Sequence, residues 1–212
     1  MKDENGLPMT GKEIKREIIS WILVVVVAFV LAYILTHYVI IKARVPTGSM
    51  LNTIQRDDKL VGLRTAYLFS EPKRGDIIIF PYPDNESEEY IKRVIGLPGE
   101  TIIIHNVKDE ASEDEYYAAV FLDLNKNGKA DDNERLEEGY VREKMWMVST
   151  DMIYKVPENS YFVMGDNRND SKDSRYWYKT HFVSGDKIIA KAWFRYSPSI
   201  GFYNSVTYNI GD

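Results

Sequence analysis

The longest apolar run of the chain lies near its beginning. Residues 18–41 contain no Asp, Glu, Lys or Arg. An α-helix rises about 1.5 Å per residue, so a helix of this length can cross the ~30 Å hydrocarbon core of a bilayer with room for tilt. Trp21 near one end and Tyr38 near the other suit the aromatic belts of the two membrane interfaces. The pattern predicts one transmembrane helix at residues 18–41, preceded by a tail of residues 1–17.

Two other structures can give a similar apolar run. A cleavable signal peptide has a shorter apolar region and ends in small residues, whereas VIIKARVP follows here. A buried core helix is normally shorter than this run. Positive charges lie on both sides of the span, before it (Lys2, Lys12, Lys15, Arg16) and close behind it (Lys42, Arg44). The excess before the span favours a cytoplasmic N-terminus and an extracytoplasmic remainder.

Beyond residue 41 the pattern changes to short runs of β-branched and aromatic residues, separated by Gly, Pro and Asp. Such runs are typical of strands, and the residues between them are typical of tight turns. We expect strands at residues 59–63, 75–82, 90–97, 100–107, 160–166 and 186–196. No long amphipathic helix competes with them. The sequence therefore predicts a mainly β domain built of antiparallel sheet over residues 42–212.

One segment of this domain, residues 108–144, differs in composition. It contains 12 acidic and 6 basic residues, and this excess accounts for the acidity of the whole chain. An acidic segment between strands is typical of a surface excursion with a solvated face. We therefore expect the chain to leave the sheet here and to return to it after residue 144.

Composition excludes two kinds of chemistry. The formal net charge is −5 and no stripe of clustered Lys and Arg is present, which argues against nucleic-acid binding because phosphates require such a cluster. The 212 residues include no Cys, so disulfides and thiolate nucleophiles are excluded. A nucleophile in this protein must be an oxygen or an amine.

The sequence VPTGSMLN follows the apolar run and places Ser49 between Gly and Met. A Ser hydroxyl becomes a strong nucleophile only when a neighbouring base takes its proton. The His residues are poorly placed for this role, since His37 lies in the apolar run, His105 near the end of a predicted strand and His181 in a polar turn. A buried Lys is the alternative base, because burial disfavours its charged form and lowers its pKa.

Lys92 is the lysine best placed for that role. In the predicted strand YIKRVIGL, Lys92 shares a face with Tyr90 and Val94, opposite Ile91 and Arg93. These neighbours on its own face are apolar enough to bury the amine. An exposed strand lysine is the alternative that this pattern leaves open.

Four separated segments give the sequence a specific resemblance: VPTGSMLNTI, RGDIIIF, EYIKRVIGLPGET and VMGDNRNDSKDSRYW. In this order and spacing they resemble the bacterial type I signal peptidases, over nearly the whole chain outside the excursion. The short domain and single span are more similar to the Gram-positive members. Lys92 separates the chain from the endoplasmic-reticulum-type relatives, which have His at this place.

The resemblance implies a membrane-anchored serine endopeptidase that removes N-terminal signal peptides from exported preproteins on the outer face of the cytoplasmic membrane. Ser49 would be the nucleophile and Lys92 the general base, a Ser-Lys dyad that uses no cofactor. Thr47, where Ser is more frequent, would supply a hydroxyl to the oxyanion hole, and Ser171 would orient the Lys amine. A nucleophile close behind the span would meet a membrane-held precursor where its cleavage site emerges.

Further residues receive roles through the same resemblance. Substrate with small side chains before the cut would bind in extended form against Val45, Met50, Glu89, Tyr90 and Ile91. Structural ion pairs near the site would be formed by Arg93, Asp166, Asp173 and Arg175.

The acidic excursion contains a second motif, DLNKNGKADDNE, at residues 123–134. It fits the calcium-loop pattern in which alternate oxygen ligands wrap the ion, Gly permits a sharp turn and a final carboxylate binds through both oxygens. The expected ligands are Asp123, Asn125, Asn127, the Lys129 carbonyl, Asp131 and Glu134. An Asn-Gly turn in an acidic hairpin is the alternative. A calcium ion here would be structural and would take no part in catalysis.

Two other functions are alternatives for a chain with this sequence. A membrane-tethered calcium-binding or adhesion module without activity would keep the fold, but the joint presence of Ser49, Lys92 and Ser171 argues against it. A self-cleaving regulator with a similar dyad would need a DNA-binding domain, for which the tail before Ile18 is too short. The sequence leaves open whether the substrates are general or dedicated, and whether the excursion selects them.

Overall fold

The structure is a computed structural model that describes residues 10–112, 114–203, 206, 208 and 210. It divides after Ile40 into a helical unit and a β domain. Residues 1–9 of the predicted tail and Glu113 of the excursion lie outside the described residues.

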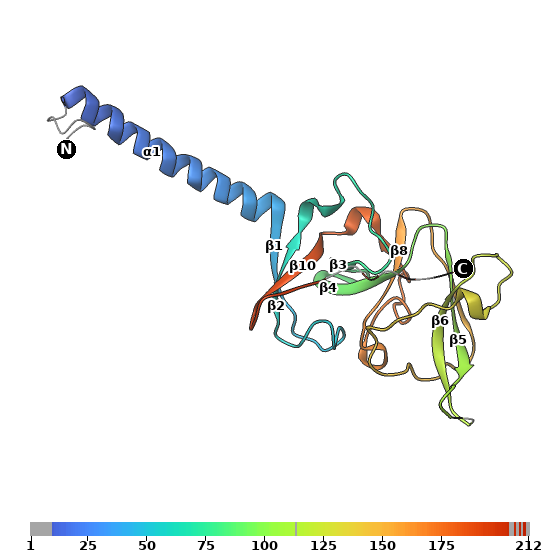
Figure 1. Cartoon of the computed structure of the whole chain (residues 1–212). Coiled ribbons are helices and arrows are strands. Elements are labelled where there is room, and N and C mark those ends of the chain that lie inside the picture. Colours follow the sequence, from blue (N-terminus) through green and yellow to red (C-terminus); the bar gives the residue numbers. More distant parts are fainter. Residues whose placement is uncertain (1–9, 113, 204–205, 207, 209, 211–212) are drawn as a thin grey trace. The chain divides into compact units, whose positions relative to one another are not determined.

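One long helix forms the first unit (Figure 1). Helix α1 spans Gly11–Ile34, and a π-helical turn, η1, continues it over Leu35–Val39. Thr10 and Glu13 form a capping box, in which each side chain accepts a hydrogen bond from the backbone N–H of the other. The helix therefore begins before the apolar run predicted at 18–41, and it ends before Ile40, which starts a strand.

Length and composition of this helix suit a membrane span. Over Gly11–Val39 the mean hydropathy of an 18-residue window reaches 3.0, and none of that window is buried within the protein. Among the described residues this is the one helix that meets both conditions. Its exposed apolar side chains, such as Phe29 and Leu31, are of the kind that lipid covers.

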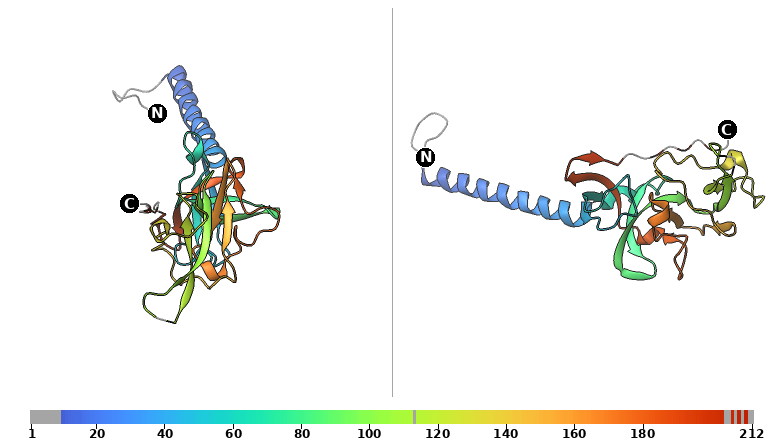
Figure 2. Two further views of the ribbon diagram at one scale, coloured as in Figure 1. Left: turned by 90° about the vertical axis from the view of Figure 1, so that its right-hand side faces the viewer. Right: turned by 90° about the horizontal axis from the view of Figure 1, so that it is seen from below.

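The β domain contains two sheets (Figures 1 and 2). The larger has the order β1-β2-β10-β3-β4-β8-β9, with β11 paired to β10, and the smaller has the order β6-β5-β7. The larger sheet consists of β1 (Ile40–Arg44), β2 (Lys59–Leu63), β3 (Ile77–Tyr82), β4 (Asn85–Gly96), β8 (Ser160–Met164), β9 (Val183–Ser184), β10 (Ala190–Ser197) and β11 (Gly201–Phe202). The smaller consists of β5 (Thr101–Lys108), β6 (Tyr116–Leu122) and β7 (Met152–Lys155). In the larger sheet, neighbouring strands in the order β2-β10-β3-β4-β8-β9 are antiparallel, and so are the strands of the smaller sheet.

The mainly β, antiparallel architecture expected from the sequence is confirmed. The six expected strands correspond to β2, β3, β4, β5, β8 and β10. Sequence patterns missed β1, β6, β7, β9 and β11. Short 3₁₀ turns complete the described elements: η2 (Arg64–Tyr67), η3 (Asp132–Glu134), η4 (Arg168–Asp170) and η5 (Gly185–Lys187).

Strand β3 is buried on both faces, which explains its continuous apolar sequence. Ile77 and Ile79 pack in one core cluster, whereas Ile78 and Phe80 pack in a second, with Trp177. Because successive side chains point to opposite faces, an all-apolar strand supplies both clusters. A third cluster joins the smaller sheet to β4 and β8 through Ile95, Ile102, Ile104, Val120, Leu122, Phe162 and Met164.

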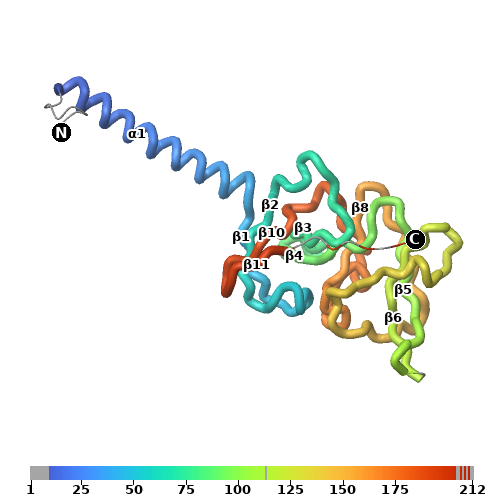
Figure 3. The backbone as a smooth tube through the Cα atoms, in the orientation of Figure 1, coloured from blue at the N-terminus to red at the C-terminus, as the bar shows by residue number. Residues whose placement is uncertain are grey.

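The acidic excursion, expected as a solvated surface segment, also extends the smaller sheet. Strand β6 pairs with β5 over its whole length, and residues 118–122 are buried. The returning chain lies against β6, where Leu136 N–H donates to the Val120 carbonyl and Arg135 forms a bridge with Phe121. Figure 3 traces this path from β6 through the yellow loop.

Candidate active site

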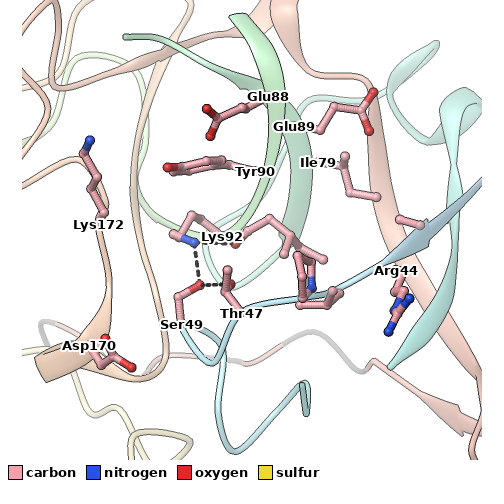
Figure 4. Close-up of a pocket in the computed structure, with 14 residues that line it drawn as sticks. Arg44, Thr47, Ser49, Ile79, Glu88, Glu89, Tyr90, Lys92, Asp170 and Lys172 are labelled. Carbon is pink, nitrogen blue, oxygen red and sulfur yellow. Dashed lines mark hydrogen bonds between the residues drawn. The ribbon is translucent and has the colours of Figure 1, made fainter. Parts of the chain in front are cut away.

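Ser49 lies in a turn behind β1, and Lys92 lies on β4. Both side chains are buried, with 7% and 3% of their surface exposed. The Lys92 Nζ is 2.7 Å from the Ser49 Oγ and 2.9 Å from the Ile91 carbonyl oxygen (Figure 4). The fold thus brings together a hydroxyl and an amine that are far apart in the sequence, and it excludes the alternative of an exposed strand lysine.

Burial changes the acid–base behaviour of Lys92. Desolvation of the ammonium form lowers the pKa of Lys92 from 10.5 to about 8, and the carboxylates of Asp173 and Asp166 offset part of this effect. Near neutral pH, a useful fraction of the amine is therefore unprotonated. An unprotonated amine at this distance can accept the proton of the Ser49 hydroxyl.

Two more hydroxyl groups lie close to the pair. Thr47 Oγ1 is 3.5 Å from Ser49 Oγ, at the limit of hydrogen bonding. Ser171 is buried, but its Oγ lies outside hydrogen-bonding geometry with the Lys92 amine. Catalytic hydrogen bonds often tighten only when substrate binds, so the absence of this bond does not remove Ser171 from the site.

Gly165 allows the turn of residues 165–171 to approach the nucleophile. A Cβ atom at Gly165 would lie 2.2 Å from Ser171 Oγ and 2.4 Å from the Ser49 carbonyl oxygen, closer than atoms can pack. Asn167 holds this turn against the nucleophile segment. Its backbone N–H donates to the Ser49 carbonyl and its side-chain amide donates to the Gly48 carbonyl, both at 3.0 Å.

Two buried ion pairs surround the site. Arg93 binds Asp166 through two hydrogen bonds of 2.8 and 2.6 Å, and thereby joins β4 to the turn 165–171. Arg175 binds Asp173 through two bonds of 2.8 Å, and Asp173 accepts the Gly165 N–H at 2.9 Å. Paired in this way, the four predicted residues fix backbone near the nucleophile.

The charge of Asp173 persists despite complete burial. Burial alone would raise its pKa, but the charge and hydrogen bonds of Arg175, together with the Gly165 N–H, outweigh this effect and the pKa of Asp173 is lowered. An ionised carboxylate near Lys92 favours the ammonium form, which would develop when the amine takes a proton.

The pair opens into a cavity of about 510 Å³. Four of the predicted substrate-binding residues line it, namely Val45, Glu89, Tyr90 and Ile91. The remaining lining residues include seven that sequence reasoning did not select: Ala43, Arg44, Pro46, Ile79, Glu88, Asp170 and Lys172. Figure 4 shows residues of β1 and the nucleophile turn on one side and residues of β4 on the other.

The prediction that Met50 contacts substrate requires correction. Met50 is fully buried in a core cluster with Val45 and Ile54 and is not among the residues that line the cavity. A tight turn, closed by a hydrogen bond from Ile54 N–H to the Met50 carbonyl, directs this side chain into the core.

The described His residues are engaged elsewhere, as their sequence positions suggest. His105 pairs with Asp151 at 2.7 Å, and His181 lies 2.6 Å from the Ser174 carbonyl. No His lines the cavity among the described residues. Across the same residues, no three His, Cys, Asp or Glu side chains are grouped to hold a metal ion.

Sequence reasoning missed one link between the excursion and the site. Arg168, within the turn 165–171, is buried and binds both carboxylate oxygens of Glu138, while its Nε donates to the Gly165 carbonyl at 3.0 Å. The phenol of Tyr140 lies 3.3 Å from the same guanidinium. The only signal for this contact was the presence of an Arg inside the motif GDNRNDS.

Comparisons with known proteins agree on one family. The family described as "Signal peptidase, peptidase S26" matches residues 18–197. A probable signal peptidase I-1 of Synechocystis is 34% identical over 82% of this chain and 79% of its own length, and a signal peptidase I of Rickettsia massiliae is 32% identical over 92% and 84%. A crystal structure of a signal peptidase I from Enterococcus faecalis is 31% identical and covers 57% of this chain and 97% of its own, at a TM-score of 0.39. The chain belongs to the signal peptidase family, peptidase S26.

Proposed function

We propose that the protein is a membrane-anchored serine endopeptidase that removes N-terminal signal peptides from exported preproteins, with Ser49 as nucleophile and Lys92 as general base. The observation that carries this proposal is the 2.7 Å contact between two buried groups, the Lys92 amine and the Ser49 hydroxyl. Membership of the family supports the reaction class. The non-enzymatic calcium or adhesion module finds no support among the relatives.

The first half of the reaction forms an acyl-enzyme. Lys92 takes the proton of Ser49 Oγ as this oxygen attacks the scissile carbonyl carbon and a new C–O bond forms. The oxyanion accepts hydrogen bonds from the Ser49 backbone N–H and from the Thr47 hydroxyl, which together stabilise the developing charge. The Lys92 ammonium then returns the proton to the leaving amine, the C–N bond breaks and the mature protein departs.

The second half of the reaction releases the signal peptide. Lys92, again unprotonated, takes a proton from a water molecule that attacks the acyl carbon. The ester C–O bond breaks, and the proton returns to Ser49 Oγ. Side chains and one backbone N–H of the protein, together with the attacking water, fill every role, so the dyad requires no metal or other cofactor. Ser171 acts as a positioning residue that orients the Lys92 amine when substrate closes the site.

Substrate is expected to bind as an extended chain between residues 43–47 and residues 88–92. Strand β3 covers one edge of β4, whereas β8 pairs with the other edge only from Arg93 onward. The preceding part of that second edge therefore lies at the cavity without a strand partner among the described residues. An extended peptide can add to such a strand through backbone hydrogen bonds. Side chains of Val45, Ile79 and Tyr90 narrow the space, which favours small residues before the cut.

The membrane helix supplies the anchor for this activity. We infer that the N-terminus lies in the cytoplasm and that residues 42–212 lie on the outer face, where exported precursors emerge. The charges before the span support this orientation.

The test is processing of a secretory precursor by the detergent-solubilised full chain. Ser49→Ala and Lys92→Ala should each reduce cleavage by roughly a thousandfold or more, and the double variant should be no worse because the two groups act as a unit. Lys92→Arg should also be inactive, since Arg keeps its proton. Lys187→Ala removes an exposed lysine and should cleave normally. Substantial cleavage by any of the four dyad variants would refute this mechanism.

A further inference from the structure

Two buried carboxylate oxygens in the acidic excursion, Asp123 Oδ1 and Glu134 Oε2, have no hydrogen-bond partner. Only 2% of Glu134 is exposed. A carboxylate oxygen buried without a donor is costly, so buried carboxylates normally pair or bind a cation. Both residues belong to the loop of residues 123–134, in which they occupy the first and the twelfth position of the calcium-loop motif.

The second oxygen of each carboxylate is fixed to the loop backbone. Glu134 Oε1 accepts the N–H groups of Leu124 at 3.1 Å and Asn125 at 3.0 Å. Asp123 Oδ2 accepts the N–H of Gly128 at 3.1 Å. Each side chain is therefore held by one oxygen, and its other oxygen remains available to a ligand.

Three further predicted ligands converge on one point of the loop. The side-chain amides of Asn125 and Asn127 both contact Asp131 Oδ2, at 2.7 and 2.8 Å. Gly128 has a φ of 72°, a left-handed conformation that Gly adopts without strain, and this gives the sharp turn that the motif requires. The amide oxygens of Asn125 and Asn127 accept the N–H groups of Asn127 and Lys129, at 2.9 and 2.8 Å, and each oxygen keeps a second lone pair that can bind a cation.

The donor set decides which cation fits. The loop offers carboxylates, amide oxygens and a backbone carbonyl, but no His or Cys. Three of the donors are carboxylates, those of Asp123, Asp131 and Glu134. Within the described part of the chain they are not grouped as a ready-made metal cluster, so the loop has to draw them together around the ion. Six ligating residues, one of them a carboxylate that binds through both oxygens, suit Ca²⁺, whereas Zn²⁺ prefers nitrogen or sulfur and Mg²⁺ requires nearly ideal octahedral geometry.

We propose that the loop of residues 123–134 binds one calcium ion, with Asp123 and Glu134 as the ligands that close its two ends. The remaining ligands are Asn125, Asn127, the Lys129 carbonyl and Asp131, with Asp131 in the position that often binds through water. The site is separate from the residues that line the catalytic cavity, so the ion stabilises the excursion and takes no part in peptide hydrolysis.

The proposed calcium loop is connected to the turn of residues 165–171 through the segment that follows Glu134. Directly after Glu134 the chain pairs with β6 through Arg135 and Leu136, and then reaches Glu138, which binds Arg168 of the turn 165–171. A cation that fixes Glu134 therefore orders the start of the segment that carries Glu138.

Calorimetric titration of the detergent-solubilised full chain with CaCl₂, after treatment with a chelator, tests the proposal. We expect one Ca²⁺ per chain with a Kd of roughly 0.1–1 mM, the range of extracellular calcium modules. The melting temperature should rise with Ca²⁺ concentration because the ion binds only the folded state. MgCl₂ at equal concentration should give a much smaller rise.

Matched variants separate a bound ion from general screening of negative charge. Glu134→Gln should raise the Kd roughly tenfold or more, because the carboxylate that closes the loop is lost. Asp132→Asn removes the same charge at an exposed position outside the ligand spacing and should leave the Kd unchanged. Absence of stoichiometric binding in the unaltered chain, or equal effects of the two variants, would overturn the proposal. Peptidase activity does not enter this test, so its outcome is independent of the catalytic mechanism.

Discussion

Among single residues, Lys92 makes the clearest prediction because its pKa is lowered to about 8. Below this pH the folded enzyme carries Lys92 as ammonium, which cannot accept a proton. The kcat/KM for precursor cleavage should therefore rise about tenfold per pH unit up to about pH 8 and then level off. Stopped assays between pH 5 and pH 10 measure this profile. A rate that continues to rise to pH 10 would mean that the base is a solvated lysine.

The same pKa has a consequence for stability. The unfolded chain holds the Lys92 proton up to about pH 10.5, whereas the folded chain releases it above about pH 8. The contribution of Lys92 to the free energy of unfolding is therefore fully present above pH 10.5, the pKa in the unfolded chain. It is lost as the pH falls through about 8, the pKa in the folded chain. Denaturant unfolding at pH 7 and pH 10 measures this effect. The gain in the free energy of unfolding from pH 7 to pH 10 should appear in the unaltered chain and be absent in Lys92→Met.

Individual site residues differ in how far the sequence could predict them. Alternation along the strand placed Lys92 among apolar neighbours, and its burial follows that pattern. The position of Met50 could not be predicted, because the turn that points it into the core depends on a backbone hydrogen bond to Ile54. Ile79 belongs to an all-apolar strand, where no pattern distinguishes the residue that reaches the cavity from its neighbours.

At the scale of elements, the excursion does more than add acidic surface. Its strand β6 contributes residues 118–122 to the core, and Glu138 provides the carboxylate for buried Arg168. Burial opposes the positive charge of Arg168, but Glu138 outweighs this effect and raises the pKa of the guanidinium. The excursion therefore supports the turn that carries Ser171.

This ion pair gives a prediction with a matched control. Glu138→Gln leaves the Arg168 charge buried without its carboxylate, which should lower the free energy of unfolding by about 3 kcal/mol and reduce kcat/KM through the loosened turn 165–171. Glu137→Gln removes a neighbouring exposed charge and should change stability by no more than about 0.5 kcal/mol. Denaturant unfolding and precursor cleavage of both variants measure the effects. Similar losses in the two variants would show that Glu138 has no special role.

Strands could be predicted where the residues of the strand itself carry a clear pattern. The strands that were found carry clear β-branched runs between turn residues, as in GDIIIFPY. Strand β1 was missed because Ile40 and Ile41 continue the apolar run of the helix without a break in hydrophobicity. Strand β6 was missed because the acidic residues around YYAAVFL dominate the composition, although the strand itself is apolar. In both cases pairing with another strand decides the structure, β1 with β2 and β6 with β5, and the pattern of one segment alone does not contain that information.

For the whole molecule, two units of different composition are joined in one chain. The helix exposes apolar side chains throughout its central window, whereas the β domain buries its apolar side chains in its own core. Such a division explains why a chain with a long apolar run still carries 28% charged residues. It also means that the orientation of the helix decides in which compartment the peptidase site operates.

Orientation can be tested directly because the chain contains no Cys. Lys12→Cys places a thiol on the exposed start of α1, and Glu110→Cys places one on an exposed turn of the β domain. A membrane-impermeant maleimide added to intact spheroplasts should label the Glu110→Cys variant and leave the Lys12→Cys variant unlabelled until the membrane is permeabilised, because the positive charges before the span hold that end inside. The unaltered chain should remain unlabelled under both conditions. Labelling of the Lys12→Cys variant alone in intact spheroplasts would reverse the inferred topology and place the catalytic domain in the cytoplasm, away from exported precursors.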